Sequence, residues 1–128
     1  MKKRSAAERR QHPRVETSLG FNVVANGYDF ITNTQNISCV GAYCHVDKYI
    51  PPFTRVAVKL ALPVANNGRG GENCDIECKG VIVRTEDGKE GGFNIAIFFN
   101  QIQNDQRKKI TEYINQFFPN NPSAIKRL

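Results

Sequence analysis

Residues 55–62 read Arg-Val-Ala-Val-Lys-Leu-Ala-Leu, a run in which a branched apolar side chain occupies every second position. Successive side chains of a β-strand point to opposite faces, so this alternation is typical of a strand buried on one face. The same period of two recurs before and after this run, in residues 19–23, 28–37, 42–46, 74–85 and 93–99. The sequence therefore predicts a mainly β protein.

Residues that favour turns separate these segments. Asn26-Gly27 is a strong signal for a two-residue hairpin, and Pro51-Pro52 interrupts the chain after residues 42–46. Residues 63–73 are rich in Asn and Gly and are expected to form a loop, while residues 86–91 turn the chain back again. Open strand edges invite aggregation, so we expect the strands to close into a small six-stranded antiparallel β-barrel.

The apolar pattern changes only near the C-terminus. There it follows the spacing i, i+3, i+4, i+7 and i+8 of an α-helix, at Ile110, Tyr113, Ile114, Phe117 and Phe118. This predicts one C-terminal helix packed at an opening of the barrel, with Asn104 or Asp105 capping its start and Pro119 ending it. The aromatic residues of 93–99 and of this helix are expected to lie in the core.

Positive charge is concentrated at the N-terminus. The chain has 128 residues and a net charge of +6, and residues 1–14 hold six Lys/Arg against one acidic residue. Residues 15–128 hold twelve Lys/Arg against eleven acidic residues, so the body is nearly neutral. We therefore expect a basic arm at 1–14, a single barrel domain at 15–118 and a tail at 119–128. This distribution favours one localised anionic partner over a broad nucleic-acid track.

The compartment expected from the N-terminus is one in which the four cysteines would be reduced thiols. The first residues are polar and do not resemble a signal peptide, and no apolar run is long enough to span a membrane, so a cytoplasmic location is expected. Cys39 and Cys44 flank a predicted turn, and Cys74 and Cys78 share one face of a predicted strand. Buried apolar thiols are the favoured interpretation, and a zinc site is the alternative.

No pattern in the sequence predicts catalysis. His12 and His45 accompany neither a matched nucleophile nor a pair of carboxylates at a defined spacing. We therefore expect a protein that is not an enzyme and that carries no cofactor and no metal.

Two short motifs remain, one before the first predicted strand and one at the end of the second. Arg9, Arg10 and Arg14 lie within six residues, in an arm that Pro13 biases toward extended backbone. Residues 36–41 read Asn-Ile-Ser-Cys-Val-Gly and place a carboxamide, a hydroxyl and a permissive backbone at the end of a strand. Taken alone, the first motif is typical of a solvated tail and the second of a simple turn.

Together the motifs resemble the PilZ domain, a bacterial receptor module for cyclic di-GMP. The family signature is RxxxR before the barrel and [D/N]xSxxG on an early strand, and it is matched by residues 10–14 and 36–41. The resemblance continues through residues 80–84, through the strand 92–99 that begins with glycine, and through the C-terminal helix. It covers the chain from Glu8 to Phe118.

The resemblance implies a role for each motif residue. Arg10 and Arg14, assisted by Arg9, would hold the guanine edges and phosphates of the ligand. Asn36 and Ser38 would bond a guanine and its neighbouring groups, and Gly41 would leave room for the purine. The chain departs from many members in carrying Asn36 where they have aspartate, which implies a weaker acceptor for guanine N–H groups.

The resemblance also implies a partner, because a receptor must pass its signal to a downstream effector protein. Two alternatives remain: a small barrel that binds single-stranded nucleic acid through its arm, and a protein-interaction module without a ligand.

Overall fold

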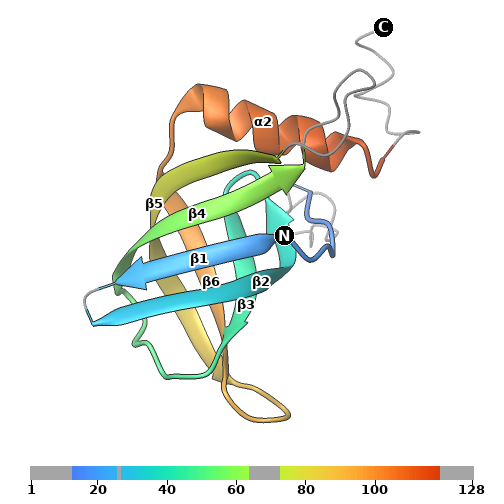
Figure 1. Ribbon diagram of the computed structural model, residues 1–128. Helices are drawn as coiled ribbons and strands as arrows, with labels where there is room; N and C mark the ends of the chain where they lie inside the picture. Colours follow the sequence, from blue (N-terminus) through green and yellow to red (C-terminus); the bar gives the residue numbers. More distant parts are fainter. Residues whose placement is uncertain (1–12, 26, 64–72, 119–128) are drawn as a thin grey trace, which may run out of the picture.

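The computed structural model describes residues 13–25, 27–63 and 73–118. In this part of the chain six antiparallel strands form a closed barrel in the order β1-β2-β3-β6-β5-β4. Their bounds are β1 Gly20–Ala25, β2 Tyr28–Ser38, β3 Gly41–Val46, β4 Arg55–Pro63, β5 Asn73–Asp87 and β6 Phe93–Gln101. The helix α2, Asn104–Asn115, follows β6 and lies across one end of the barrel (Figure 1). The predicted fold class is confirmed.

The alternation that predicted β4 is reproduced in its burial. Val56, Val58, Leu60 and Leu62 are buried, whereas Arg55, Ala57 and Lys59 are exposed. The same pattern on the other strands fills the barrel with apolar side chains. The largest of those fully buried include Phe21, Ile37, Ile50, Leu60, Ile76, Ile82, Ile95 and Phe99. Burial of this contiguous set is the main force that holds the barrel together.

The turns and strand ends differ little from the predicted ones. Ala25 pairs with Tyr28 across a two-residue connection, and Gly27 has the positive φ of 80° that such a turn requires. The predicted loop 63–73 is shorter at both ends, because Pro63 still belongs to β4 and Asn73 already belongs to β5. Asn26, residues 64–72 and the predicted tail lie outside the described residues.

The predicted helix is correct in its contacts but wrong at both ends. Ile110, Tyr113 and Ile114 are the side chains that α2 buries against the barrel. Its N-cap is Gln103, which makes no side-chain capping bond, so neither Asn104 nor Asp105 caps the helix. The helix ends at Asn115, before the predicted stop at Pro119, which lies outside the described residues. No helix in the described part of the chain is long and apolar enough to cross a membrane.

Two aromatic residues expected in the core are half exposed. Phe98 is 46% exposed, because the period of two turns it outward between the buried Ile97 and Phe99. Phe117 is also 46% exposed, because it follows the end of α2 and stacks edge-on against Tyr113 beside the helix. Only the former lies near the predicted motifs.

Candidate functional site

The segment before β1 is fastened to the end of β2. The backbone N–H of Val15 donates to the carbonyl oxygen of Ile37 at 3.0 Å, and the N–H of Ile37 donates back to Val15 at 3.0 Å. Val15 is buried in the core, whereas the preceding Arg14 is exposed. The two hydrogen bonds therefore hold Arg14 next to the strand end that carries the second motif.

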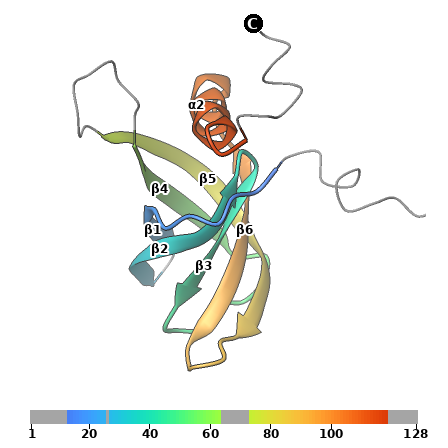
Figure 2. The same cartoon turned by 90° about the vertical axis from the view of Figure 1, so that its right-hand side faces the viewer.

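Further contacts secure the same segment toward β2 and α2. The hydroxyl of Thr34 donates to the carbonyl oxygen of Thr17 at 2.6 Å and accepts the backbone N–H of Leu19 at 2.9 Å. The hydroxyls of Thr17 and Tyr113 lie 3.1 Å apart, which connects the segment to the helix. In Figure 2 this stretch passes beside the β2–β3 turn at the end of the barrel that carries α2. The segment that leads from Arg14 into β1 is thus held by contacts with two elements, β2 and α2.

Four of the six predicted site residues line one hollow. Arg14, Asn36, Ser38 and Gly41 lie around a cavity of about 130 Å³, together with side chains of β5 and β6. Arg9 and Arg10 lie outside the described residues. The structure therefore brings together the described parts of both motifs, which are more than twenty residues apart in sequence.

Ser38 shapes the turn between β2 and β3. Its side chain is buried, with 2% exposure, and its hydroxyl oxygen accepts the backbone N–H of Val40 at 3.2 Å. The carbonyl oxygen of Val40 in turn accepts the N–H of Phe99 at 2.8 Å, which ties the turn to β6. Ser38 thereby holds the shape of the turn that borders the hollow.

Gly41 allows two strands to approach each other closely. It pairs with Phe98 of β6, and a Cβ atom at this position would collide with the carbonyl oxygen of Ile97. The obstacle is backbone, which cannot rotate away as a side chain can. The fold itself therefore requires a glycine here, in addition to any role that the residue has toward a purine.

Asn36 follows an irregularity in the β2–β3 ladder. The register shifts between Thr34 and Asn36, and Asn36 then pairs with Tyr43. Such bulges re-aim side chains and are frequent beside functional sites. Asn36 is half-buried, so its carboxamide reaches the hollow while remaining accessible to solvent.

Tyr43 is a residue of this hollow that the sequence motifs did not indicate. Its hydroxyl donates to Oε1 of Glu86 at 2.8 Å, and the Arg84 guanidinium lies 5.8 Å from its ring centroid. Arg84 also pairs with Glu86 at 3.2 Å. Burial and then the Glu86 hydrogen bond raise the pKa of Tyr43, so the phenol stays protonated at neutral pH. Its position two residues after Gly41 on one strand could have predicted the shared face.

The other side of the hollow is apolar and open to solvent. Val83 of β5 is 48% exposed and Phe98 of β6 is 46% exposed, and both line the cavity. A flat apolar wall opposite polar Arg14 and Asn36 suits a ligand that combines a ring system with hydrogen-bonding edges.

The cysteines and His45 do not add a metal centre to this picture. Within residues 13–25, 27–63 and 73–118, no three His, Cys, Asp or Glu side chains are grouped to hold a metal ion. Cys44 is buried, and burial raises its thiol pKa to about 12, whereas Cys39, Cys74 and Cys78 are only half-buried. His45 is exposed on β3, with Nδ1 at 3.0 Å from Oδ1 of Asn94, and His12 lies outside the described residues.

Solved structures share this fold. One is the Bacillus subtilis inhibitor of motility (MotI/DgrA), with a TM-score of 0.75 and 16% identity over 88% of this chain and 53% of that protein. The chain thus spans about half the length of that inhibitor. Another is the PilZ domain of YcgR from Escherichia coli, solved with c-di-GMP, with a TM-score of 0.61 and 11% identity over 94% of this chain and 99% of that domain.

The sequence comparison agrees with the structural one. A search among curated proteins gave no match. The sequence profile of the PilZ domain, in contrast, matches residues 8–116, which is most of the chain and includes both motifs. The chain therefore belongs to the PilZ domain family.

Proposed function

We propose that this protein is a non-catalytic cytoplasmic receptor for cyclic di-GMP, which it binds between its N-terminal arginine arm and the barrel. The bound state is then read by a downstream partner protein. The observation that carries this proposal is the Val15–Ile37 bridge, because it seats Arg14 over the same hollow as Asn36 and Ser38. The presence of c-di-GMP in the structure of the YcgR PilZ domain supports the choice of ligand.

The chemistry of the hollow matches the chemistry of this ligand. Cyclic di-GMP presents two phosphate charges and two guanine bases. The Arg14 guanidinium offers a planar fork of donors that fits phosphate oxygens or the O6/N7 edge of guanine. Asn36 and Ser38 offer shorter polar groups for the remaining base edge, and Val83 and Phe98 offer a surface for the flat face of the purine. Arg9 and Arg10 are proposed to complete the phosphate contacts.

Isothermal titration calorimetry with cyclic di-GMP tests the proposal directly. We expect a dissociation constant of about 0.1 to 10 µM. Arg14→Ala removes a charged bidentate partner and should weaken binding by about 2 kcal/mol, roughly thirtyfold. Lys48→Ala is the control, because this exposed cation lies between β3 and β4 and does not line the hollow. Wild-type affinity in both Arg10→Ala and Arg14→Ala would refute the site.

Two other ligands test which chemical groups the proposed site recognises. Adenine places an N6 donor where guanine places the O6 acceptor, so an arginine fork would face another donor. Cyclic di-AMP should therefore bind at least tenfold more weakly, at about 1–3 kcal/mol per unpaired group. A single-stranded oligonucleotide should show only weak, salt-sensitive binding. Tight oligonucleotide binding would instead favour the nucleic-acid alternative.

The relay to a partner is proposed to depend on closure of the arm over the ligand. Trypsin cleaves after Arg9, Arg10 and the lysines that precede them, so the rate of cleavage at these sites reports how accessible the arm is. Saturating cyclic di-GMP should slow cleavage there while leaving sites in residues 119–128 unaffected. Equal cleavage rates with and without the ligand would exclude arm closure even if calorimetry confirmed binding.

A further inference from the structure

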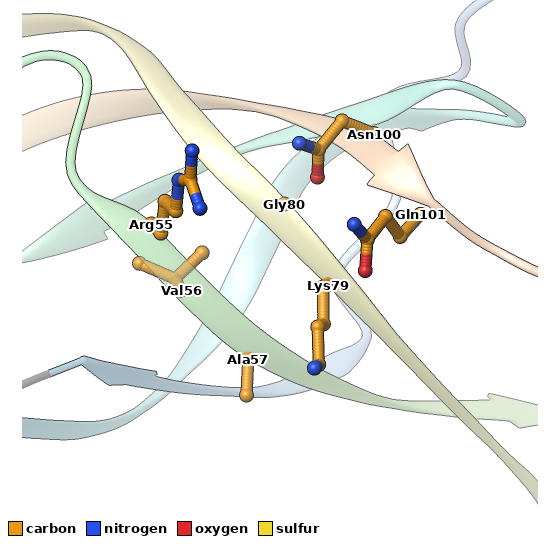
Figure 3. Close-up of a pocket in the computed structure, with 7 residues that line it drawn as sticks. All are labelled: Arg55, Val56, Ala57, Lys79, Gly80, Asn100 and Gln101. Carbon is orange, nitrogen blue, oxygen red and sulfur yellow. The ribbon is translucent and has the colours of Figure 1, made fainter.

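A second hollow lies on the barrel where β4, β5 and β6 run side by side. Its volume is about 340 Å³, larger than that of the hollow beside Arg14. The polar residues that line it are Arg55, Lys79, Asn100 and Gln101 (Figure 3). None of the described residues of the two family motifs lines it. It is therefore a separate feature of the surface.

Strand register places the two cations together. Arg55 of β4 pairs with Val81 of β5, and Lys79 pairs with Ala57. Arg55 and Lys79 are thus diagonal neighbours on adjacent strands, and both are exposed on the outer face of the sheet. Ala57, which lies on this face opposite Lys79, carries only a methyl group and leaves room above the sheet, whereas the Cβ position of Gly80 faces the buried Ile97.

A bulge on β6 brings in the two amides. Lys79 pairs with Gln101 and Val81 pairs with Phe98, so two steps along β5 correspond to three along β6. The extra residue breaks the inward-outward alternation, and Asn100 and Gln101 are consequently both exposed. In the view of Figure 3 their amide ends, the Arg55 guanidinium and the Lys79 ammonium lie around the stretch of β5 at Gly80.

The described residues give the hollow no negative charge. Among them no acidic side chain lines it, and neither Arg55 nor Lys79 forms an ion pair. The nearest carboxylate along β5, that of Glu77, is engaged by Lys59 at 3.8 Å. Two exposed cations on adjacent strands, neither of them paired with a carboxylate in the described part of the chain, raise the local positive potential, so an anion between them would be favoured.

The donor set indicates which anion fits. An arginine, a lysine and two carboxamides offer more N–H groups than the oxygens of one carboxylate can accept. A phosphate monoester carries nearly two negative charges at pH 7.5 and has three terminal oxygens, so it matches two cations flanked by amides. The Ala57 methyl group lies on the exposed face of β4 beside the two cations, where an attached organic group can rest.

We propose that this hollow is a binding site for a small phosphorylated molecule, with Arg55 and Lys79 holding the phosphate and Asn100 and Gln101 completing its hydrogen bonds. The site is independent of the proposed cyclic di-GMP site, because Arg14, Asn36 and Ser38 do not line it. It would allow the barrel to respond to a second, chemically different ligand.

Titration of the ¹⁵N-labelled full chain by NMR tests this proposal with three probes at pH 7.5. Adenosine 5′-monophosphate should shift the backbone amides of Lys79 and Gly80 and the side-chain amides of Asn100 and Gln101. Inorganic phosphate should shift the same signals with lower affinity, because it lacks the organic group. Adenosine, which lacks the phosphate, should leave them unchanged.

Single substitutions distinguish binding at a specific site from nonspecific attraction of anions to a basic protein. Arg55→Ala and Lys79→Ala should each weaken the nucleotide at least about tenfold, the effect expected for loss of one charge-assisted contact. Lys48→Ala removes the same charge from an exposed position outside the hollow and should change nothing. Arg55→Lys should restore little, because lysine lacks the planar fork. The NMR spectra also report whether each variant is folded.

The outcomes distinguish this site from the proposed receptor function. Arg14→Ala should retain nucleotide monophosphate binding, and Arg55→Ala should retain cyclic di-GMP binding, so either site can fail alone. Shifts confined to residues 1–14, equal shifts with adenosine, or identical affinities in Arg55→Ala, Lys79→Ala and Lys48→Ala would each overturn the proposal.

Discussion

Replacement of Gly41 by alanine tests whether this motif glycine serves the fold or the ligand. The added Cβ would meet the carbonyl oxygen of Ile97 at a separation that atoms do not tolerate, with the carbonyl carbon also within 3.4 Å. Both obstacles belong to the backbone of β6, so relief requires β3 and β6 to move apart. Crowding of this kind costs about 1–3 kcal/mol, and weakening the adjacent Gly41–Phe98 pairing adds about 1 kcal/mol.

The total of about 2–4 kcal/mol is a large fraction of the stability of an ordinary domain, roughly 5–15 kcal/mol. Urea denaturation followed by circular dichroism should therefore show the Gly41→Ala midpoint lowered by about 1–2 M. Gly20→Ala is the matched control, because the nearest neighbour of its Cβ would be the Cβ of Ala61 at an ordinary 3.5 Å. This second variant should be as stable as the wild type, or more stable by up to about 1 kcal/mol.

Calorimetry on the same variants separates the two roles. If the glycine serves the fold, Gly41→Ala should lose stability and cyclic di-GMP affinity together. Equal urea midpoints for Gly41→Ala and Gly20→Ala would refute the structural reasoning. Loss of ligand binding at full stability would then assign the glycine to purine accommodation.

Three further predictions address the strand end, the ligand acceptor and the core thiol. Val15→Pro deletes the N–H that bonds Ile37, so calorimetry should show roughly tenfold weaker cyclic di-GMP binding. Unchanged affinity would mean that the bridge does not position the arm. Asn36→Asp should tighten binding about fivefold, since a carboxylate accepts guanine N–H groups more strongly than an amide, and weaker binding would contradict that role. The pKa of Cys44 is raised by burial from 9.0 to about 12, so above pH 9 the unfolded chain releases a thiol proton that the folded chain keeps. Stability in urea should therefore fall by about 1 kcal/mol per pH unit from pH 9 to 12, and Cys44→Ala should remove that part of the slope.

The barrel could be predicted from the sequence because the pattern that specifies each strand lies within that strand. In residues 55–62 the period of two specifies both the strand and its buried face, and a sheet built from such segments closes to remove its edges. Phe98 obeys the same rule. It was expected in the core, but the period of two turns its side chain outward between the buried Ile97 and Phe99, and it is half exposed.

The ends of the helix were less predictable because several neighbouring residues could have been the N-cap or the last helical residue. Gln103, Asn104 and Asp105 are consecutive polar residues, and the observed N-cap makes no side-chain bond that would distinguish it. At the other end Phe117 continues the apolar spacing, although the helix has already stopped at Asn115. The spacing alone does not reveal where backbone hydrogen bonding ends.

The sequence predicted separate parts of the candidate site but not how they come together. The two motifs indicated Arg14 and residues 36–41, but their meeting depends on a pairing between Val15 and Ile37 that no local pattern encodes. Tyr43 carries no motif and contributes through its neighbours Arg84 and Glu86 on another strand. The bulge that exposes both Asn100 and Gln101 is likewise a property of two paired strands and not of either alone.

The Val15–Ile37 bridge also sets the local concentration of the arm. Arg10 is five residues before Val15, so covalent geometry keeps its Cα within about 18 Å of the bridge in any conformation. A group confined to so small a volume meets a ligand in the hollow at an effective concentration in the millimolar range, without diffusing from solution. If Arg9 and Arg10 bind the ligand as proposed, the two backbone hydrogen bonds would make that contact an intramolecular step, and lengthening the chain between Arg10 and Val15 would progressively lower the effective concentration.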